Sequence, residues 1–196
     1  PLFAPILAGF IDEYPDIELE IFADDALSDL TAGGFDAGVR MGEMLEADMI
    51  AVRLSGPFRF VIAGTPDYFA RFGKPQTIAE LAQHRCIRLR LASSGMMPWT
   101  FQVGNREEEI QISGPVIVND FAAMMMAMRT GAALGMIAEP IIKHELAEGT
   151  LELALDDFAA SSAGLFLYYP SRKQVMPKLR ALIDYARDHL PPDLRS

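Results

Sequence analysis

Helix-like and strand-like segments alternate along almost the whole chain, and this pattern limits the possible folds more than any other feature of the sequence. Residues 2–14 carry apolar side chains at helical spacing, whereas residues 17–22 alternate between apolar and acidic side chains, as in a strand with one wet face. A chain that alternates strands and helices builds βαβ units, in which each helix returns the chain to the same end of the sheet. The sequence therefore predicts an α/β fold with a largely parallel sheet.

Capping and turn residues mark the boundaries of the predicted elements. Thr65 offers an N-cap, with Pro66 in the first turn of a helix, and Thr77 with Glu80 has the spacing of a capping box. The three glutamates at 107–109 are predicted to form a solvated turn. The predicted helices cover 2–14, 26–32, 66–72, 121–130, a stretch from 140 to 149, and 175–190. The predicted strands are 17–22, 36–41, 49–54, 58–63, 86–91, 100–103, 110–112, 116–118, 133–138, 151–155 and 165–169.

The acidic balance excludes some partners for these residues. The 196 residues carry 17 Lys and Arg against 27 Asp and Glu, a formal net charge of −10. Because nucleic-acid binding depends largely on Lys and Arg that neutralise phosphates, this segment alone is expected to bind neither DNA nor an anionic membrane. No apolar run approaches the roughly 20 residues that cross a bilayer, and the first residues show no basic start or cleavage-like site of a retained signal peptide.

Few residues suggest metal or catalytic chemistry. Cys86 is the only cysteine, so the chain forms no internal disulfide, which fits a reducing cytoplasm; a buried, inert thiol is expected. His84, His144 and His189 have no second ligand at metal-like spacing, and neither a metal site nor a cofactor is expected. The sequence contains no GxSxG, no P-loop and no GxGxxG before a helix, and no Ser/His/Asp set can be assembled.

A series of short motifs, each weak alone, runs from the first predicted helix to the last. In chain order they are FIDEYPDIEL (10–19), GFDAGVRMG (34–42), AGTPDY (63–68), HRCI (84–87), WTF (99–101), VND (118–120), GMIAEP (135–140), YPSR (169–172) and VMPKLR (175–180). Together they resemble the effector-binding domain of LysR-type transcription regulators, and most closely the branch of the contact-regulated repressor.

The resemblance implies an α/β fold of two Rossmann-like lobes joined by two crossover strands, like type 2 periplasmic binding proteins, with a small-molecule cleft between the lobes. Residues 1–62 and 168–196 would form lobe I and residues 63–167 lobe II, with 58–63 and 165–169 as crossover strands. The family also forms side-by-side antiparallel dimers and often tetramers. Its N-terminal winged helix-turn-helix and linker helix are absent from this chain, as are the strand and Ser/Ala-rich turn that precede the family's first helix.

These expectations describe a cytoplasmic bacterial sensor that is not an enzyme. A small metabolite, an organic acid or an aromatic compound, would bind between the lobes and change the spacing of the attached DNA-binding domains. The alternative is an extracytoplasmic solute-binding protein of the same fold, which would need an export signal upstream and would usually be monomeric. An enzyme on a similar scaffold is a third possibility, and no catalytic motif supports it.

Junctions between strands and helices supply the candidate ligand-binding residues. Ligands in open α/β sheets lie beyond the carboxyl ends of strands, and helix N-termini attract anions. In a two-lobed fold several of these junctions would converge on one cleft. The predicted effector-binding residues are Arg40, Met41, Gly42, Ala63, Gly64, Ser93, Ser94, Trp99, Asn119, Asp120, Ala138 and Glu139.

Several of these candidates also have a simpler explanation. Arg40 could pair with an effector carboxylate in a fork, or form a salt bridge with Glu43. Asn119-Asp120 is first of all a helix N-cap, and Ser93-Ser94 could equally be a plain loop. Trp99, which the resemblance places near the cleft wall, could instead be a core residue.

The apolar first helix and the methionine-rich helix are candidates for dimer contacts. In the second of these, Phe121, Met124, Met125 and Met128 recur at the spacing of a packing face. The resemblance implies that this helix also packs across the dimer, against the first helix of the partner. The predicted dimer-interface residues are Leu7, Phe10, Phe22, Met124 and Met128.

Overall fold

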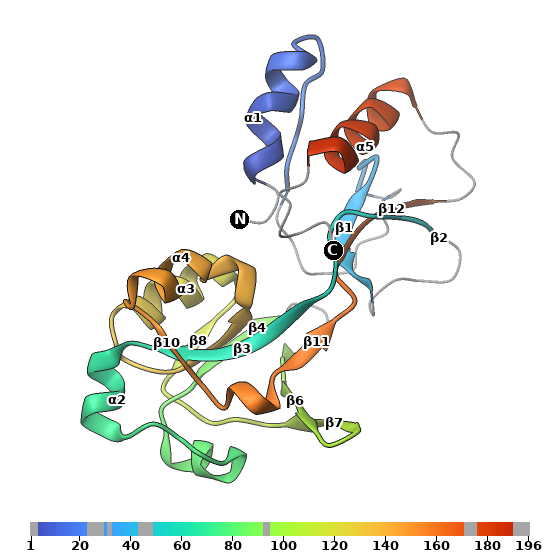
Figure 1. Cartoon of the computed structure of the whole chain (residues 1–196). Coiled ribbons are helices and arrows are strands. Elements are labelled where there is room, and N and C mark those ends of the chain that lie inside the picture. Colours follow the sequence, from blue (N-terminus) through green and yellow to red (C-terminus); the bar gives the residue numbers. More distant parts are fainter. Residues whose placement is uncertain are drawn as a thin grey trace. The chain divides into compact units, whose positions relative to one another are not determined.

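Two compact units make up the chain. One consists of Pro1–Phe58 and Ser162–Ser196, and the other of Arg59–Ser161. The boundaries predicted from the sequence, after residues 62 and 167, lie a few residues later than these in both places. The computed structural model describes residues 4–22, 30, 33–42, 49–91, 95–170 and 176–189 (Figure 1).

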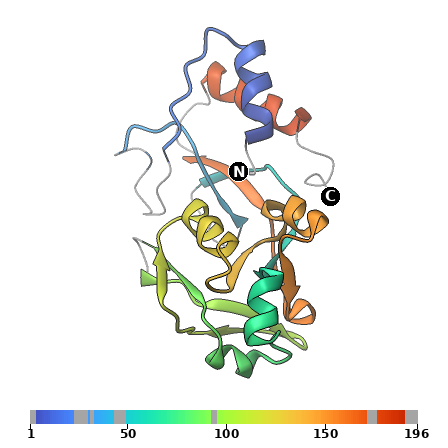
Figure 2. The same cartoon turned by 90° about the vertical axis from the view of Figure 1, so that its left-hand side faces the viewer.

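The first unit combines an antiparallel sheet with two helices. Its strands lie in the order β1 (Gly38–Met41), β12 (Leu165–Pro170) and β2 (Met49–Arg53), and both pairs are antiparallel. Helices α1 (Ala4–Glu13) and α5 (Pro177–His189) lie side by side, as both views show (Figures 1 and 2).

Alternation along β12 decides which face of this sheet is covered. Leu167 is buried with Ile6 and Phe10 of α1 and Ile183 of α5. Successive side chains of a strand point to opposite faces, so the face that carries Leu167 is the one packed against the helices. Phe166, its neighbour, belongs to the other face.

Strand β3 (Phe58–Gly64) is the centre of the second unit. It pairs antiparallel with β9 (Gly135–Ala138) and β10 (Glu152–Ala154), and β11 (Ala160–Ser162) joins the same sheet. The other strands are β4 (Ile87–Leu91), which lies between β5 (Gly95–Met96) and β8 (Val116–Val118), and the hairpin of β6 (Trp99–Val103) and β7 (Arg106–Ile110). The helices are α2 (Pro66–Phe72), α3 (Phe121–Arg129), α4 (Lys143–Glu148) and the 3-10 helices η2 (Ile78–Gln83), η3 (Glu139–Ile141) and η4 (Asp156–Phe158).

The alternating side chains of β3 pack in two different hydrophobic clusters. Val61 and Ala63 pack in the cluster that holds Met124 and Met128 of α3. Ile62, which points the other way, packs in the cluster that holds Tyr68 of α2. A strand covered on both faces needs an uninterrupted apolar run, which is what the sequence offers here.

The helix N-caps predicted at Thr65 and Asp120 are confirmed. The Thr65 hydroxyl accepts a hydrogen bond from the Tyr68 amide (3.2 Å), and Pro66 occupies the first turn of α2. Asp120 caps α3 by accepting from the Ala123 amide (2.8 Å). Both caps satisfy amides that the first helical turn leaves unpaired.

The capping box predicted at Thr77 is confirmed in one half, since Glu80 reaches back to the Thr77 amide, and is wrong in the other half. The Thr77 hydroxyl lies 3.0 Å from the Glu80 carboxylate instead of taking the amide, and Glu80 accepts from the Gln76 amide (2.9 Å). These bonds hold the pKa of Glu80 below its usual value, with the Gln76 amide as the largest cause. The segment that follows is the 3-10 helix η2.

The prediction of a largely parallel sheet is also wrong for the described residues. Strands β4 and β8 form a parallel ladder, whereas β1, β2, β9 and β10 each pair antiparallel with their neighbours. Hydrophobic periodicity shows which face of a strand is buried, but the direction of its neighbour is set by the path of the whole chain.

The secondary structure of two segments differs from the one predicted from the sequence. Residues 17–22 alternate as a strand would, but they form no ladder with the described residues. A strand requires a hydrogen-bonded neighbour, and alternation alone does not reveal whether one is present. The glutamates at 107–109 lie in strand β7, and the turn falls earlier, at Gly104. The predicted helix at 26–32 lies outside the described residues except for Leu30.

Candidate functional site

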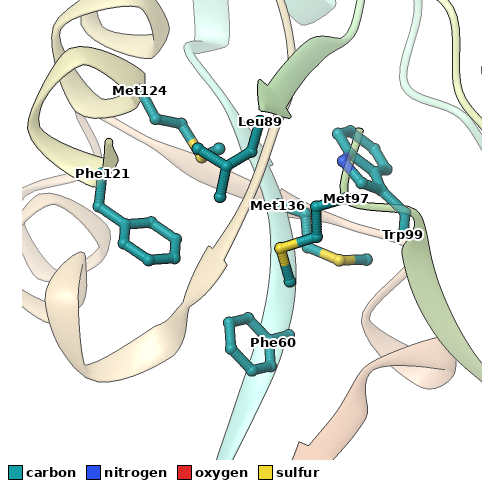
Figure 3. Close-up of a pocket in the computed structure, with 7 residues that line it drawn as sticks. All are labelled: Phe60, Leu89, Met97, Trp99, Phe121, Met124 and Met136. Carbon is teal, nitrogen blue, oxygen red and sulfur yellow. The ribbon is translucent and has the colours of Figure 1, made fainter. Parts of the chain in front are cut away.

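An apolar pocket lies within the second unit (Figure 3). Its open volume is about 10 Å³, roughly one water-sized sphere. A metabolite does not fit in a space of this size, so a ligand would have to displace side chains. The pocket is lined by Phe60, Leu89, Met97, Trp99, Phe121, Met124 and Met136.

The pocket forms where the parallel ladder of β4 and β8 ends. Leu89 lies opposite Val118, the last residue of β8, and helix α3 begins three residues later at Phe121. The Met97 amide donates to the Leu89 carbonyl (2.9 Å), which holds the neighbouring loop against β4. The carboxyl ends of parallel strands are the usual place for ligands in α/β proteins.

The lining determines what the pocket can accept. Three methionines, three aromatic residues and one leucine leave no charged group on its wall. Methionine side chains are unbranched and flexible, so they can move aside for a ligand at low cost. The pocket therefore suits an aromatic or aliphatic group and excludes a bare charge.

Among the residues predicted to bind the effector, Trp99 lines this pocket, and Met124, predicted at the dimer interface, lines it as well. The Trp99 side chain is nearly buried, so it serves the core and the pocket wall together. The other lining residues were missed, because an apolar residue at a strand end has the same pattern as a core residue.

Ala63 and Gly64 lie in the core of the second unit. Ala63 is fully buried, and a Cβ added to Gly64 would lie 2.6 Å from Leu134 and 3.2 Å from Phe69. Both positions are tightly packed, and their contact with an effector stays a prediction. Ala138 is likewise buried.

Glu139 is held by an arginine that the sequence prediction missed. Arg59 donates to both Glu139 oxygens (2.9 and 2.8 Å) and also lies 2.9 Å from Asp156. The pKa of Arg59 is raised, chiefly by its hydrogen bond to Glu139. This ion pair fixes the Glu139 carboxylate in place, and its contact with an effector stays a prediction. An arginine inside an apolar strand was the available signal for this contact.

The predicted residues of the first unit lie at the end of β1. The Arg40 guanidinium stacks on Tyr168, 4.8 Å from the ring centre, and no acidic side chain among the described residues pairs with it. Glu43, the alternative partner, lies outside the described residues, as do Ser93 and Ser94. Gly42 donates to the Gly164 carbonyl (3.0 Å).

An arginine–aromatic row crosses the sheet of the first unit. Arg40 and Arg53 lie on either side of Phe166 in the register of the three strands. Arg53 stacks on Phe166 at 4.7 Å and donates to the Ala163 carbonyl (2.6 Å). Both guanidinium groups are thus oriented by aromatic rings, a contact that holds them without neutralising them.

Three of the predicted interface residues are buried and expose almost no surface. Phe10, Met124 and Met128 are buried in the cores of their own units, because the helical stripe that suggested an interface packs on the sheet. Leu7 is half-buried. Phe22 is 64% exposed and stacks on Phe35, so it stays available for contact.

Cys86 is buried beside Leu134, and burial raises the pKa of its thiol to about 12. At pH 8 the thiol is therefore neutral, and only thiolates react readily. We expect no modification of the folded chain by iodoacetamide within an hour at pH 8, and complete modification in guanidinium chloride. Mass spectrometry of both samples checks this, and rapid labelling of the folded chain would contradict it.

The described residues contain no group of three or more His, Cys, Asp or Glu side chains placed to hold a metal ion. Among them, no helix is both long and apolar enough to span a membrane.

The fold shows which structural class of protein the chain belongs to. The chain has the α/β fold of two Rossmann-like lobes joined by two crossover strands, as in type 2 periplasmic binding proteins. The structure of CrgA, a LysR-type transcriptional regulator from Neisseria meningitidis, superposes with a TM-score of 0.84 at 25% identity, over 96% of this chain and 64% of that one. Ligand-binding domains of this class enclose small molecules.

Residues 1–191 match the family model of the LysR substrate binding domain, and the chain belongs to this family. The uncharacterized HTH-type transcriptional regulator YcaN of Escherichia coli (strain K12) is 40% identical over 182 residues, which are 93% of this chain and 59% of the relative. A putative transcriptional regulator of Pseudomonas aeruginosa is 33% identical over 187 residues, 95% of this chain and 61% of the relative. The chain spans about three fifths of the length of these relatives.

Proposed function

We propose that this chain senses a small organic acid that carries an aromatic or other apolar group, as the effector-binding part of a LysR-type regulator. The apolar pocket at the end of the parallel ladder of β4 and β8 is the observation that carries the proposal. Its wall of aromatic and methionine side chains suits the apolar part of such a ligand.

The acid group needs a cation, and the pocket has none. Arg40, in the first unit, stays the residue predicted to bind an effector carboxylate, because an aromatic ring orients its guanidinium and no acidic side chain among the described residues pairs with it. A guanidinium binds a carboxylate through two parallel hydrogen bonds.

Regulation would follow from the coupling between effector binding and the arrangement of the protein. A ligand shifts an equilibrium only by the difference between its affinities for the two arrangements. We propose that this shift acts on a dimer in the cytoplasm, and that DNA is bound through an N-terminal domain outside this chain. The net charge of −10 supports that division of labour, since it disfavours DNA binding by these residues.

Trp99 makes the proposal testable, because the only tryptophan of the chain lines the pocket. We expect a saturable change in its fluorescence with at least one of benzoate, salicylate, phenylacetate and cinnamate, and none with acetate. The Arg40→Gln variant should bind that acid at least about tenfold more weakly, since a hydrogen bond to a charged group is lost.

Arg106→Gln is the matched control, because Arg106 is an exposed arginine of strand β7. It should leave the affinity unchanged. No response to any of the four aromatic acids would contradict the proposed ligand class. A response that Arg40→Gln leaves intact would exclude Arg40 from the site.

A further inference from the structure

A second, polar depression lies in the second unit, apart from the apolar pocket. It has a volume of about 270 Å³ and shares no lining residue with that pocket. Helix α2 supplies one wall through Asp67 and Arg71, and the last turn of α3 supplies the other through Arg129 and Thr130. Neither the family relationship nor the proposed effector site accounts for it.

The floor of this depression is fixed by a close approach of two helix ends. Gly131, which follows α3, has φ +68°, and a Cβ at this position would lie 2.8 Å from the Thr65 hydroxyl. Thr65 is itself held as the N-cap of α2 by the Tyr68 amide. Its hydroxyl oxygen accepts that bond, so its proton is available to a ligand.

The two arginines differ in how they are held. Arg129 pairs through Nη2 with Glu145, whose side chain is nearly buried and whose pKa is lowered chiefly by this bond. The pair positions the Arg129 guanidinium, which is 62% exposed and keeps further N–H groups open. Arg71 stacks on Phe72 at 4.9 Å and has no acidic partner among the described residues.

The lining of the depression also includes acceptors. The Asp67 carboxylate is one helical turn before Arg71, but the two are not within ion-pair distance. The Thr130 hydroxyl donates to the Ala127 carbonyl (2.7 Å), which leaves its oxygen as an acceptor. The lining thus offers two guanidinium groups and a hydroxyl proton, together with a carboxylate and a hydroxyl oxygen.

We propose that this depression binds a small α-amino acid as a second input to the domain. The amino acid's carboxylate would bind Arg71 and Arg129, and its ammonium group would bind Asp67 and Thr130. A simple anion would face Asp67, and a simple cation would face two arginines, so a zwitterion satisfies the lining best. The volume lies just below the range of common ligand pockets, as a ligand of this size requires.

The test is an NMR titration of the isotope-labelled chain with a pool of the twenty common L-amino acids at 1 mM each, followed by single members. We expect shifts at the amides of Thr65, Arg71, Thr130 and Gly131, and at no comparable strength near Trp99. The best amino acid is then compared with its analogues that lack the amino or the carboxyl group, each of which should bind at least about tenfold more weakly.

Arg71→Gln should weaken binding of that amino acid at least about tenfold without lowering the melting temperature, because Arg71 is exposed. Arg106→Gln should change neither. An absence of shifts with the pool, shifts confined to other residues, or equal binding of the deaminated analogue would each overturn the proposal. The pool includes the aromatic amino acids, but binding is read at residues that line the depression and not the apolar pocket. Shifts near Trp99 alone would report the proposed effector site, so the two outcomes are distinguishable.

Discussion

Replacement of Gly164 by alanine is expected to destabilise the fold by about 3 kcal/mol. Gly164 has φ +99°, where an L side chain is strained, and an added Cβ would lie 2.5 Å from the Ser55 carbonyl and against that of Gly56. Both obstacles are backbone atoms that cannot rotate away. Residues 55–56 and 162–165, two segments of the first unit, meet here.

Several hydrogen bonds tie these segments together and oppose relief of the strain. The Leu165 amide donates to the Ser55 hydroxyl (2.8 Å), and the Gly164 amide lies 3.3 Å from the Ser162 hydroxyl. Ser55 and Ser162 are both buried, where an unmade hydrogen bond costs about 1–3 kcal/mol. A shift that made room for the new Cβ would break some of these bonds.

Gly149 provides the matched control for this substitution. It also has positive φ (+68°), but an added Cβ would meet nothing within 4 Å. Gly149→Ala should therefore cost only the backbone strain, about 1 kcal/mol. Guanidinium unfolding followed by circular dichroism measures both variants, and equal losses would contradict the close approach at Gly164.

Replacement of Trp99 by alanine is expected to cost about 3–5 kcal/mol of unfolding free energy. The indole is 3% exposed and packs in the cluster that holds Phe101 and Leu134. Truncation removes its buried area and leaves a cavity that joins the existing apolar pocket. Empty cavities with apolar walls take up apolar molecules of matching shape.

Indole should therefore restore part of the lost stability of the Trp99→Ala chain. Thermal unfolding with and without millimolar indole measures this, and the original chain should show a much smaller shift. Met126→Ala is the control, since Met126 is 67% exposed and its truncation should change stability by no more than about 0.5 kcal/mol. If indole failed to raise the melting temperature of Trp99→Ala, the enlarged pocket would not exist as described.

Local signals predicted much of the fold. Caps at Thr65 and Asp120 act within three residues of sequence, so their geometry can be inferred without knowledge of the rest of the chain. The apolar run of β3 likewise shows that the strand is covered on both faces. The direction of strand neighbours and the absence of a ladder at 17–22 depend on distant segments, which periodicity does not report.

The candidate site was predicted less well for a related physical reason. Trp99 and Asp120 are distinctive residue types at a strand start and a helix start, and they could be singled out. Met136 and Leu89 line the pocket from positions that look like ordinary core, so nothing in the sequence separates them from it. Arg59 was missed because its acidic partners, Glu139 and Asp156, are 80 and 97 residues away (139 − 59 and 156 − 59).

The order of strands in the first unit has a consequence for how the chain folds during synthesis. Strand β12 lies between β1 and β2, yet it is made after all of the second unit. The second unit is one continuous stretch and can fold as soon as it leaves the ribosome. Strands β1 and β2 have no ladder with each other, so they must wait for residues 165–170 to complete their sheet. During translation the second unit is therefore complete before the first unit can form its sheet.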